Sequence, residues 1–434
     1  MFSNNFNFEL VANTISGPNS INKVYEFLKE KNYKKVGLIL DKNLFKKSGY
    51  AKIFLKKIKK KKILKNILYF SGTSEPTYQY LDLVISKLRK KRNNKFDCLI
   101  AIGGGSTIDF AKGVATLLKN SGSALKYRGF PKKLNRSIPI IAIPSTSGTG
   151  SELAYNAVFT DLKSKKKLGI NTRNNYPILS ILDPKIPVNS PRNVILNSSL
   201  GALIRSIDSM FNKESNKISI MFSENAFKLL FNNLPKVLKN KSNLEYWSNM
   251  QWGAYLSIAA LLNSSNGPGA AIAYYLSANY NIPQGLGYAI SGISFFERNH
   301  KKGYYEYSKL FDLIEKKPNR RNLSKKEKSE FVIHSLLKIF ENSKLTLKAA
   351  NISRSQNAKI LKFISKTPNK INSSSVLTSL VSKNPIRLNK KDLTKSYVND
   401  LNKKIENQLS ESTISDEDQY ILNHKLQSLK EINI

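Results

Sequence analysis

The sequence has little cysteine and no long apolar run. Its one cysteine, Cys98, excludes a disulfide within the chain and is typical of proteins from a reducing compartment. No apolar run reaches the roughly 20 residues that a membrane-spanning helix needs. The first residues lack the charged and then apolar order of a signal peptide. We therefore expect a cytoplasmic protein with no membrane partner.

Acidic residues are scarce relative to basic ones: the chain has 30 Asp and Glu but 71 Lys and Arg, which gives a formal net charge of +41. Such an excess favours nucleic-acid binding where the cations cluster, because they displace counterions from phosphates. Here the lysines are spread along the chain. The densest run, residues 56–65, keeps Ile58, Ile63 and Leu64 among the cations, as one face of a surface helix does. With no recognisable nucleic-acid-binding motif, we expect no specific nucleic-acid partner, only weak attraction to polyanions at low salt.

The first part of the chain alternates short aliphatic runs with amphipathic stretches. The runs predict buried parallel strands because they are almost continuously aliphatic, and the stretches have the apolar spacing of helices. The expected strands are residues 35–40, 67–70, 98–102, 138–143 and 178–182, and the expected helices are residues 21–31, 78–90 and 107–119. This alternation indicates a doubly wound parallel sheet.

After about residue 190, helical periodicity dominates. It is clearest in residues 196–211, 223–232, 247–262 and 331–342. The chain is long enough for two domains, and we expect an α/β domain over residues 1–184 and a mainly helical, all-α domain over residues 185–434. The stretch after about residue 409 is charged enough to fray or to pack loosely.

A glycine-rich turn lies between an expected strand and an expected helix, in the sequence CLIAIGGGSTIDFAKGVA. Gly103, Gly104 and Gly105 allow a close approach of the backbone to a phosphate, and the helix offers free N–H groups. Ser106 and Thr107 can cap that helix or donate to phosphate oxygens. A tight turn without a ligand is the alternative.

A second polar turn, in the sequence IAIPSTSGTGSE, follows another expected strand. Because both turns follow the carboxyl ends of parallel strands, we expect them at one edge of the sheet, where such sheets bind dinucleotides. Asp41 ends a further expected strand. Its carboxylate either accepts hydrogen bonds from a ribose, which favours NAD over NADP, or caps the following helical segment, residues 42–48.

Several stretches resemble the iron-containing (group III) alcohol dehydrogenase family, which is itself similar to the dehydroquinate synthase and glycerol dehydrogenase folds. They are LDKNLFKKSG, GTSEPT, AIGGGSTIDFAK, IPSTSGTGSE, KKLGINT, SILDPKI and IPQGLGYAI, with weaker matches in KGYYEYSKLFDLI and NPIRLNKKDL. The resemblance runs from about residue 5 to 400 and implies an NAD-dependent oxidoreductase that forms a homodimer. The cofactor contacts that it implies are Asp41, Gly104, Gly105, Ser106, Asp109, Thr146, Thr149, Lys167 and Leu182.

The metal ligands of this family are missing from the sequence. The resemblance implies an aspartate and three histidines that hold iron or zinc, which polarises the substrate oxygen. The matching positions here are Gly201, Arg205, Ala270 and Gln284. The three histidines, His300, His334 and His424, lie outside these motifs. We therefore expect no bound metal.

Four polar residues are candidates to replace the metal. We hypothesise that Arg205 binds a substrate oxygen or carboxylate, that Tyr274 serves as general acid or base, that Asp208 pairs with Arg205, and that Gln284 binds a substrate hydroxyl. The expected substrate is a small polyol, sugar or hydroxy acid, such as the sugar acids of surface polysaccharides on which some family members act. The alternative is a catalytically inactive NAD-binding pseudoenzyme or regulatory subunit, in which Arg205 and Asp208 pair structurally.

Overall fold

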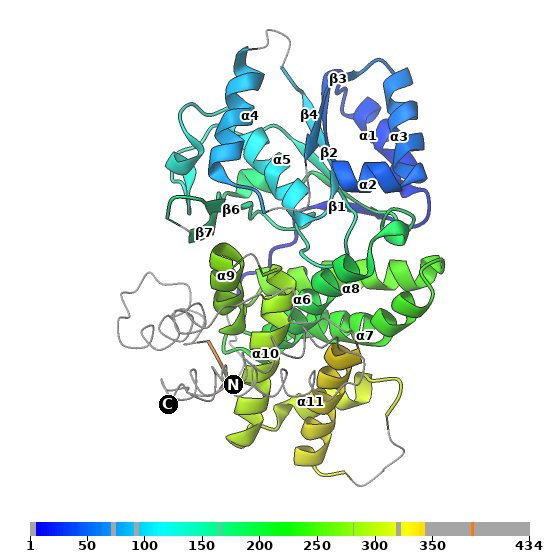
Figure 1. Ribbon diagram of the computed structural model, residues 1–434, viewed down its shortest axis with the longest axis vertical. Helices are drawn as coiled ribbons and strands as arrows, with labels where there is room; N and C mark the ends of the chain where they lie inside the picture. The colour runs from blue at the N-terminus through cyan, green and yellow to red at the C-terminus, as the bar shows by residue number, and fades with distance from the viewer. Residues whose placement is uncertain are drawn as a thin grey trace, which may run out of the picture. The chain divides into compact units, whose positions relative to one another are not determined.

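The computed structural model describes residues 6–70, 75–90, 95–164, 166–280, 282–317, 323–342 and 383–385. These residues form two compact units (Figure 1). The sheet unit comprises Phe6–Ser206 and Met221–Asn263, and the helical unit comprises Ile207–Ile220 and the described residues from Ser264 onward. Helix α6 (Arg192–Phe211) runs from one unit into the other.

The sheet unit contains a six-stranded parallel sheet with the strand order β1-β8-β5-β4-β2-β3. Its strands are β1 (Asn13–Ser16), β2 (Val36–Asp41), β3 (Leu64–Phe70), β4 (Cys98–Gly103), β5 (Ile140–Pro144) and β8 (Leu179–Leu182). A separate hairpin pairs β6 (Val158–Asp161) with β7 (Lys166–Gly169). With the helices described below, this architecture confirms the expected fold class, a parallel-sheet domain followed by helices.

Alternate residues of the central strands face two different helical layers. Ile39, Leu99 and Ala101 belong to the core beneath α4 (Tyr78–Lys90) and α5 (Gly105–Leu117). Their chain neighbours, including Leu38, Leu40 and Ile100, pack on the other face beneath α1 (Lys23–Glu30) and α3 (Gly49–Lys60). Both faces are therefore buried, which explains why these strands read as continuous aliphatic runs.

The lysine-rich run of residues 56–65 is not one helix, so that expectation was wrong. Helix α3 ends at Lys60, Lys62 adopts a positive φ of 55°, and β3 begins at Leu64. The chain therefore turns within the run, and Ile63 and Leu64 pack against the core that α3 and the sheet share. The short helix α2 (Lys42–Lys47) precedes α3.

Strands β1, β6 and β7 were not expected from the sequence. Each has four residues, and β1 (NTIS) and β7 (KKLG) carry polar side chains and are only partly buried. Short partly polar strands lack the aliphatic signal of buried ones, and β1 is placed by its pairing with β8 from a distant part of the chain.

The second half of the described chain is helical, as expected. Helices α6, α7 (Lys217–Lys239) and α8 (Leu244–Leu262) are followed by α9 (Gly269–Tyr280), α10 (Gln284–Lys301) and α11 (Lys325–Asn342). Short 3-10 helices span Ser20–Asn22, Ala124–Tyr127, Arg173–Asn175, Pro187–Asn189 and Glu306–Leu313. Most of α7 and all of α8 belong to the sheet unit, so a domain boundary after residue 184 stays a prediction.

In the described part of the chain, no helix combines the length and the apolar character that a membrane crossing requires. The stretch after residue 409 and most of the motif NPIRLNKKDL lie outside the described residues, as do the first three residues of GTSEPT.

Candidate functional site

The two glycine-rich loops lie side by side at the carboxyl edge of the sheet. Strands β4 and β5 end at the paired residues Gly103 and Pro144, and the Ser145 N–H donates to the Gly103 carbonyl at 2.8 Å. Helix α5 begins directly after this point, with Gly104 as its N-cap. The expectation that both loops meet at one edge is therefore confirmed.

Two glycines of the first loop, Gly103 and Gly105, allow close contacts that a side chain would block. Their role is not a left-handed backbone, because neither has a positive φ. A Cβ at Gly103 would lie 2.5 Å from Thr107 Oγ1. A Cβ at Gly105 would clash with the side chain of Thr149 in the second loop. At Gly104 the nearest atom, Thr146 Cγ2, is at an ordinary 3.4 Å. The loops thus contact each other through glycine on one side and threonine on the other.

We expect Gly105→Ala to lower the thermal unfolding midpoint, because overpacking at such a contact costs about 1–3 kcal/mol. A loss of stability would distinguish this close contact from an open helical position, where replacing glycine with alanine stabilises the protein by about 1 kcal/mol. Gly49→Ala is the control, because Gly49 is an exposed residue of α3 with open space around a Cβ, and this variant should unfold at or above the wild-type temperature. Differential scanning calorimetry of both variants checks this, and an unchanged midpoint for Gly105→Ala would contradict the contact.

The second loop, residues 145–156, turns its carbonyl groups toward donors in the body of the sheet unit. The donor–acceptor pairs are Ser190 Oγ to Ser145 O, Ser199 Oγ to Ser147 O, Arg205 Nη1 to Gly148 O, Ser180 Oγ to Glu152 O, and Lys112 Nζ to the carbonyls of Ser151, Ala154 and Asn156. Among the described residues, the peptide N–H groups of residues 146–151 make no hydrogen bond to a protein acceptor. A row of N–H groups without protein acceptors is suited to an anion such as a diphosphate.

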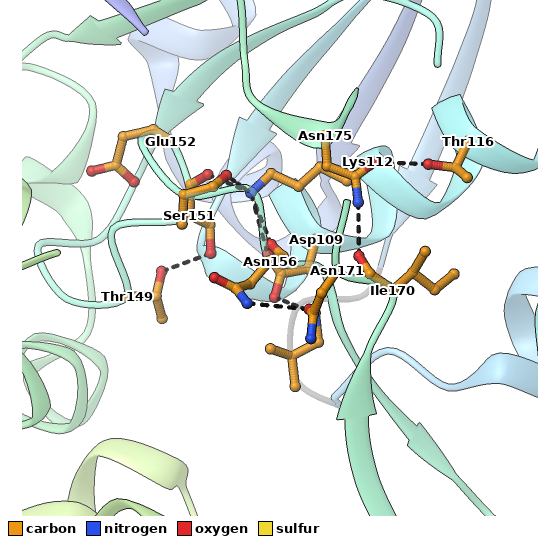
Figure 2. A network of polar contacts seen from close by, with 12 residues as sticks. Asp109, Lys112, Thr116, Thr149, Ser151, Glu152, Asn156, Ile170, Asn171 and Asn175 are labelled. Carbon is orange, nitrogen blue, oxygen red and sulfur yellow. Dashed lines mark hydrogen bonds and ion pairs between the residues drawn. The ribbon is translucent and has the colours of Figure 1, made fainter. Parts of the chain in front are cut away.

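Buried charged groups lie beneath this loop (Figure 2). The Lys112 side chain is 0% exposed, and its Nζ donates to the three carbonyls at 2.7, 2.6 and 3.0 Å. Asp109 lies 4.0 Å from that Nζ and accepts from the Val158 N–H. Burial lowers the pKa of Lys112 to about 8 and raises the pKa of Glu152 to about 7, and it also raises the pKa of Asp109. The Asp109 carboxylate thus takes part in this interior network, and its contact with a cofactor stays a prediction.

The other expected cofactor residues occupy different places in the sheet unit. Asp41 caps α2, and its Oδ1 accepts from the N–H groups of Asn43 and Leu44 at 2.8 and 3.0 Å. The capping alternative is therefore confirmed, and a ribose contact by the same carboxylate stays a prediction. Lys167 on β7 pairs with Glu75 at 3.0 Å, and Leu182 is buried at the end of β8. Gly104, Ser106 and Thr146 are partly accessible, and Thr149 is exposed.

Several functional groups were not singled out from the sequence, above all Lys112. Its signal was a lysine inside the almost wholly buried helix α5, within the motif GGGSTIDFAK. The serines that hold the second loop had no such signal, because Ser180, Ser190 and Ser199 come from other parts of the chain. A small hollow beside the loop is lined by Ser145, Thr146, Ser147, Ser190, Val194, Ile195, Ser198, Ser199 and Trp247.

The four residues expected to replace a metal are divided between the units. Arg205, in the sheet unit, is 9% exposed, and its Nη1 donates to the Gly148 carbonyl at 2.8 Å and to Ser257 Oγ at 3.1 Å. Asp208, Tyr274 and Gln284 belong to the helical unit. Tyr274 on α9 and Gln284 at the start of α10 are both half-buried.

Asp208 forms a buried pair with a tyrosine that the sequence did not single out. Tyr288 Oη lies 2.6 Å from Asp208 Oδ2 and 3.0 Å from Asn266 Oδ1. Burial raises the pKa of Asp208 to about 7, although the hydrogen bonds from Tyr288 and Gly267 lower it. One hydroxyl hydrogen cannot serve both oxygens, so a proton on Asp208 completes this group of contacts.

The residues at the four metal-ligand positions do not fit a divalent metal. Gly201 and Ala270 offer no donor atom, Arg205 carries a fixed positive charge, and Gln284 offers one neutral amide oxygen. In the described part of the chain, no three His, Cys, Asp or Glu side chains lie close enough together to hold a metal ion.

The chain is similar in sequence to known dehydrogenases. Residues 12–184 match the model for iron-containing alcohol dehydrogenase, and residues 195–401 match the C-terminal model of the same family. The 1,3-propanediol dehydrogenase of Citrobacter freundii is 30% identical over 275 residues, which are 63% of this chain and 70% of that protein. The NAD-dependent methanol dehydrogenase of Bacillus methanolicus is 30% identical over 190 residues, 44% of this chain and 50% of that protein.

The fold also matches solved structures. The sulfoacetaldehyde reductase of Bifidobacterium kashiwanohense, solved in complex with NAD+, aligns with a TM-score of 0.75 and 21% identity. The alignment covers 91% of this chain and 98% of that one. At this identity the match establishes the fold.

Proposed function

Because this chain belongs to the iron-containing alcohol dehydrogenase family, we propose that it is an NAD-dependent oxidoreductase that interconverts an alcohol and a carbonyl compound. The observation that carries this proposal is the row of peptide N–H groups in residues 146–151, next to the N-terminus of α5. Both features bind anions, and together they suit the diphosphate of a dinucleotide.

Asp41 favours NAD over NADP in this proposal. Its carboxylate lies at the end of β2, at the same edge of the sheet as the glycine-rich loops. A negative charge there repels a 2′-phosphate, whereas a carboxylate accepts hydrogen bonds from ribose hydroxyls. The NAD dependence of the Bacillus methanolicus relative supports the same choice.

The proposed reaction proceeds without a bound metal. Hydride passes from the carbinol carbon to the nicotinamide ring, and the hydroxyl proton passes to a base, which leaves a carbonyl compound and NADH. We propose Arg205 for binding the substrate oxygen, Gln284 for a substrate hydroxyl, and Tyr274 with Asp208 for the proton. A small polyol, sugar or hydroxy acid is the proposed substrate class, and the diol and sulfonated aldehyde in the relatives' names support small polar substrates.

We expect purified protein to bind NAD, to contain no stoichiometric iron or zinc, and to oxidise an alcohol from a panel of small polyols and hydroxy acids. Calorimetric titration with NAD, elemental analysis and NADH absorbance measure these three properties. No binding of NAD would refute the proposed function. One iron or zinc per chain would refute the metal-free reaction alone.

A catalytically inactive NAD-binding subunit is the second candidate. The observation that favours it is the loss of every usual donor at the four metal-ligand positions. It predicts NAD binding without turnover of any alcohol or aldehyde, so the same panel separates the two. In both cases the family membership supports a homodimer, which sedimentation velocity would test.

A further inference from the structure

We infer that Arg205 and Lys112 are positioning residues for the dinucleotide. These two buried cations hold carbonyl groups of the second loop inward. The Gly148 carbonyl that Arg205 binds shares a peptide unit with the Thr149 N–H, which is thereby turned toward the ligand, and Lys112 fixes the end of the loop through three further carbonyls. The inference rests on the proposed function for the identity of the ligand. It goes further by assigning Arg205, which stands at a metal-ligand position of the family, a role in shaping the cofactor site.

Arg205 anchors the first half of the loop to α6. Gly148 packs so closely on this helix that a Cβ there would lie 2.6 Å from the Ser198 carbonyl oxygen. Arg205 is seven residues beyond Ser198, which is two helical turns, so both lie on the same face of α6. The guanidinium therefore reaches the Gly148 carbonyl that this face already contacts, at 2.8 Å, and also bonds Ser257 Oγ of α8.

Lys112 anchors the second half of the loop to α5 in the same way. It is seven residues beyond Gly105, again two turns, and therefore lies on the face of α5 that contacts Thr149 of the second loop. Its ammonium group donates to the carbonyls of Ser151, Ala154 and Asn156. Each of the two helices thus contacts the loop at one point and holds it with a cation two turns further on.

This arrangement has an electrostatic consequence for an anionic ligand. In a trans peptide unit the C=O of one residue and the N–H of the next point in opposite directions, so fixing the Gly148 carbonyl inward directs the Thr149 N–H outward. Donors that are oriented before binding need no rearrangement when the ligand arrives. Loss of the Arg205 guanidinium would remove a hydrogen bond from the Gly148 carbonyl. The Gly148–Thr149 peptide unit could then rotate, and its N–H would no longer be held toward the ligand.

The test compares Arg205→Met with Arg89→Met by calorimetric titration with NAD. Arg89 is the matched control because its guanidinium also bonds backbone carbonyls, those of Leu117 and Asn120, at the opposite end of α5. We expect Arg205→Met to weaken NAD binding at least about tenfold, the usual worth of a hydrogen bond to a charged group. Arg89→Met should bind NAD like the wild type.

Amide hydrogen exchange in the ligand-free protein provides a readout that does not depend on NAD. The N–H groups of Leu153 and Ala154 donate to the Gly150 carbonyl and report on the shape of the loop. They should exchange faster in Arg205→Met and at the wild-type rate in Arg89→Met. If the wild type does not bind NAD, the proposed function fails, and this measurement still decides whether Arg205 shapes the loop.

Two further variants provide alternatives if Arg205→Met does not fold, and they distinguish the effect of losing the positive charge from the effect of changing the side-chain volume. Arg205→Lys retains the cation and should recover most of the NAD affinity. Arg205→Gln retains one donor and should fall between the lysine and methionine variants, and it replaces Arg205→Met if that variant does not fold. Wild-type affinity and wild-type exchange in a folded Arg205→Met or Arg205→Gln would overturn the inference, as would an affinity loss in Arg205→Lys equal to that in Arg205→Met.

Discussion

Replacing Lys112 with methionine is expected to lower the free energy of unfolding by about 3–5 kcal/mol, the usual cost of breaking a buried ionic contact. Methionine has similar length but no donor, so the carbonyls of Ser151, Ala154 and Asn156 would lose the ammonium group that now binds them. The buried Asp109 carboxylate would also lose its cation at 4.0 Å. Urea denaturation followed by circular dichroism measures the effect.

The same substitution at Lys119, near the exposed end of α5, is the control for Lys112→Met. Lys119 is exposed, and surface substitutions usually change stability by less than about 0.5 kcal/mol. If Lys112→Met were as stable as Lys119→Met, the buried ammonium would contribute no more than a methionine of similar volume. The role that we assign to Lys112 in holding the second loop would then be wrong.

Replacing Asp208 with asparagine, unlike Lys112→Met, is expected to raise the free energy of unfolding at pH 8. Burial raises the pKa of Asp208 to about 7, above the value near 3.9 of an unfolded chain. The stability that this proton contributes is complete below about pH 4 and is lost as the pH rises through 7. At pH 8 the wild type therefore carries an unfavourable buried charge, on the order of 2–4 kcal/mol.

An asparagine side chain reproduces the protonated form of Asp208. Its amide can donate to Tyr288 Oη, whose hydrogen then serves Asn266 Oδ1, the pattern that the 2.6 and 3.0 Å contacts favour. We expect the free energy of unfolding of Asp208→Asn to equal or exceed that of the wild type at pH 8. At pH 4 the two free energies should be the same. Urea denaturation across this range measures the difference.

Asp82→Asn provides the contrast for that experiment. Asp82 accepts from Ser123 Oγ at 2.6 Å and from the Ala124 N–H at 2.7 Å near the surface, so its substitution should destabilise the protein by about 1 kcal/mol. A comparable loss for Asp208→Asn at pH 8 would mean that Asp208 is needed as an anion. The proton that we place on it would then be absent.

The buried central strands and the glycine-rich turns could be predicted because each depends on a local pattern. The aliphatic runs at β2, β4 and β5 predicted strands that are covered on both faces, and these strands are buried in the structure. The reversal at Lys62 was missed because a turn made of lysines lacks the usual glycine, proline or asparagine signal. Helices α9 and α10 were not identified, since small residues and glycines weaken their apolar spacing.

By itself, the sequence determined the buried central strands, the helices that cover them, the two glycine-rich turns and the lack of usual donors at the four metal-ligand positions, because these features are encoded in neighbouring residues. Only the tertiary structure decided what holds the second turn in shape. Lys112 and Ser151 are 39 residues apart, and Arg205 and Gly148 are 57 apart. No local pattern encodes such pairs, since they form only when α5 and α6 pack against the same loop.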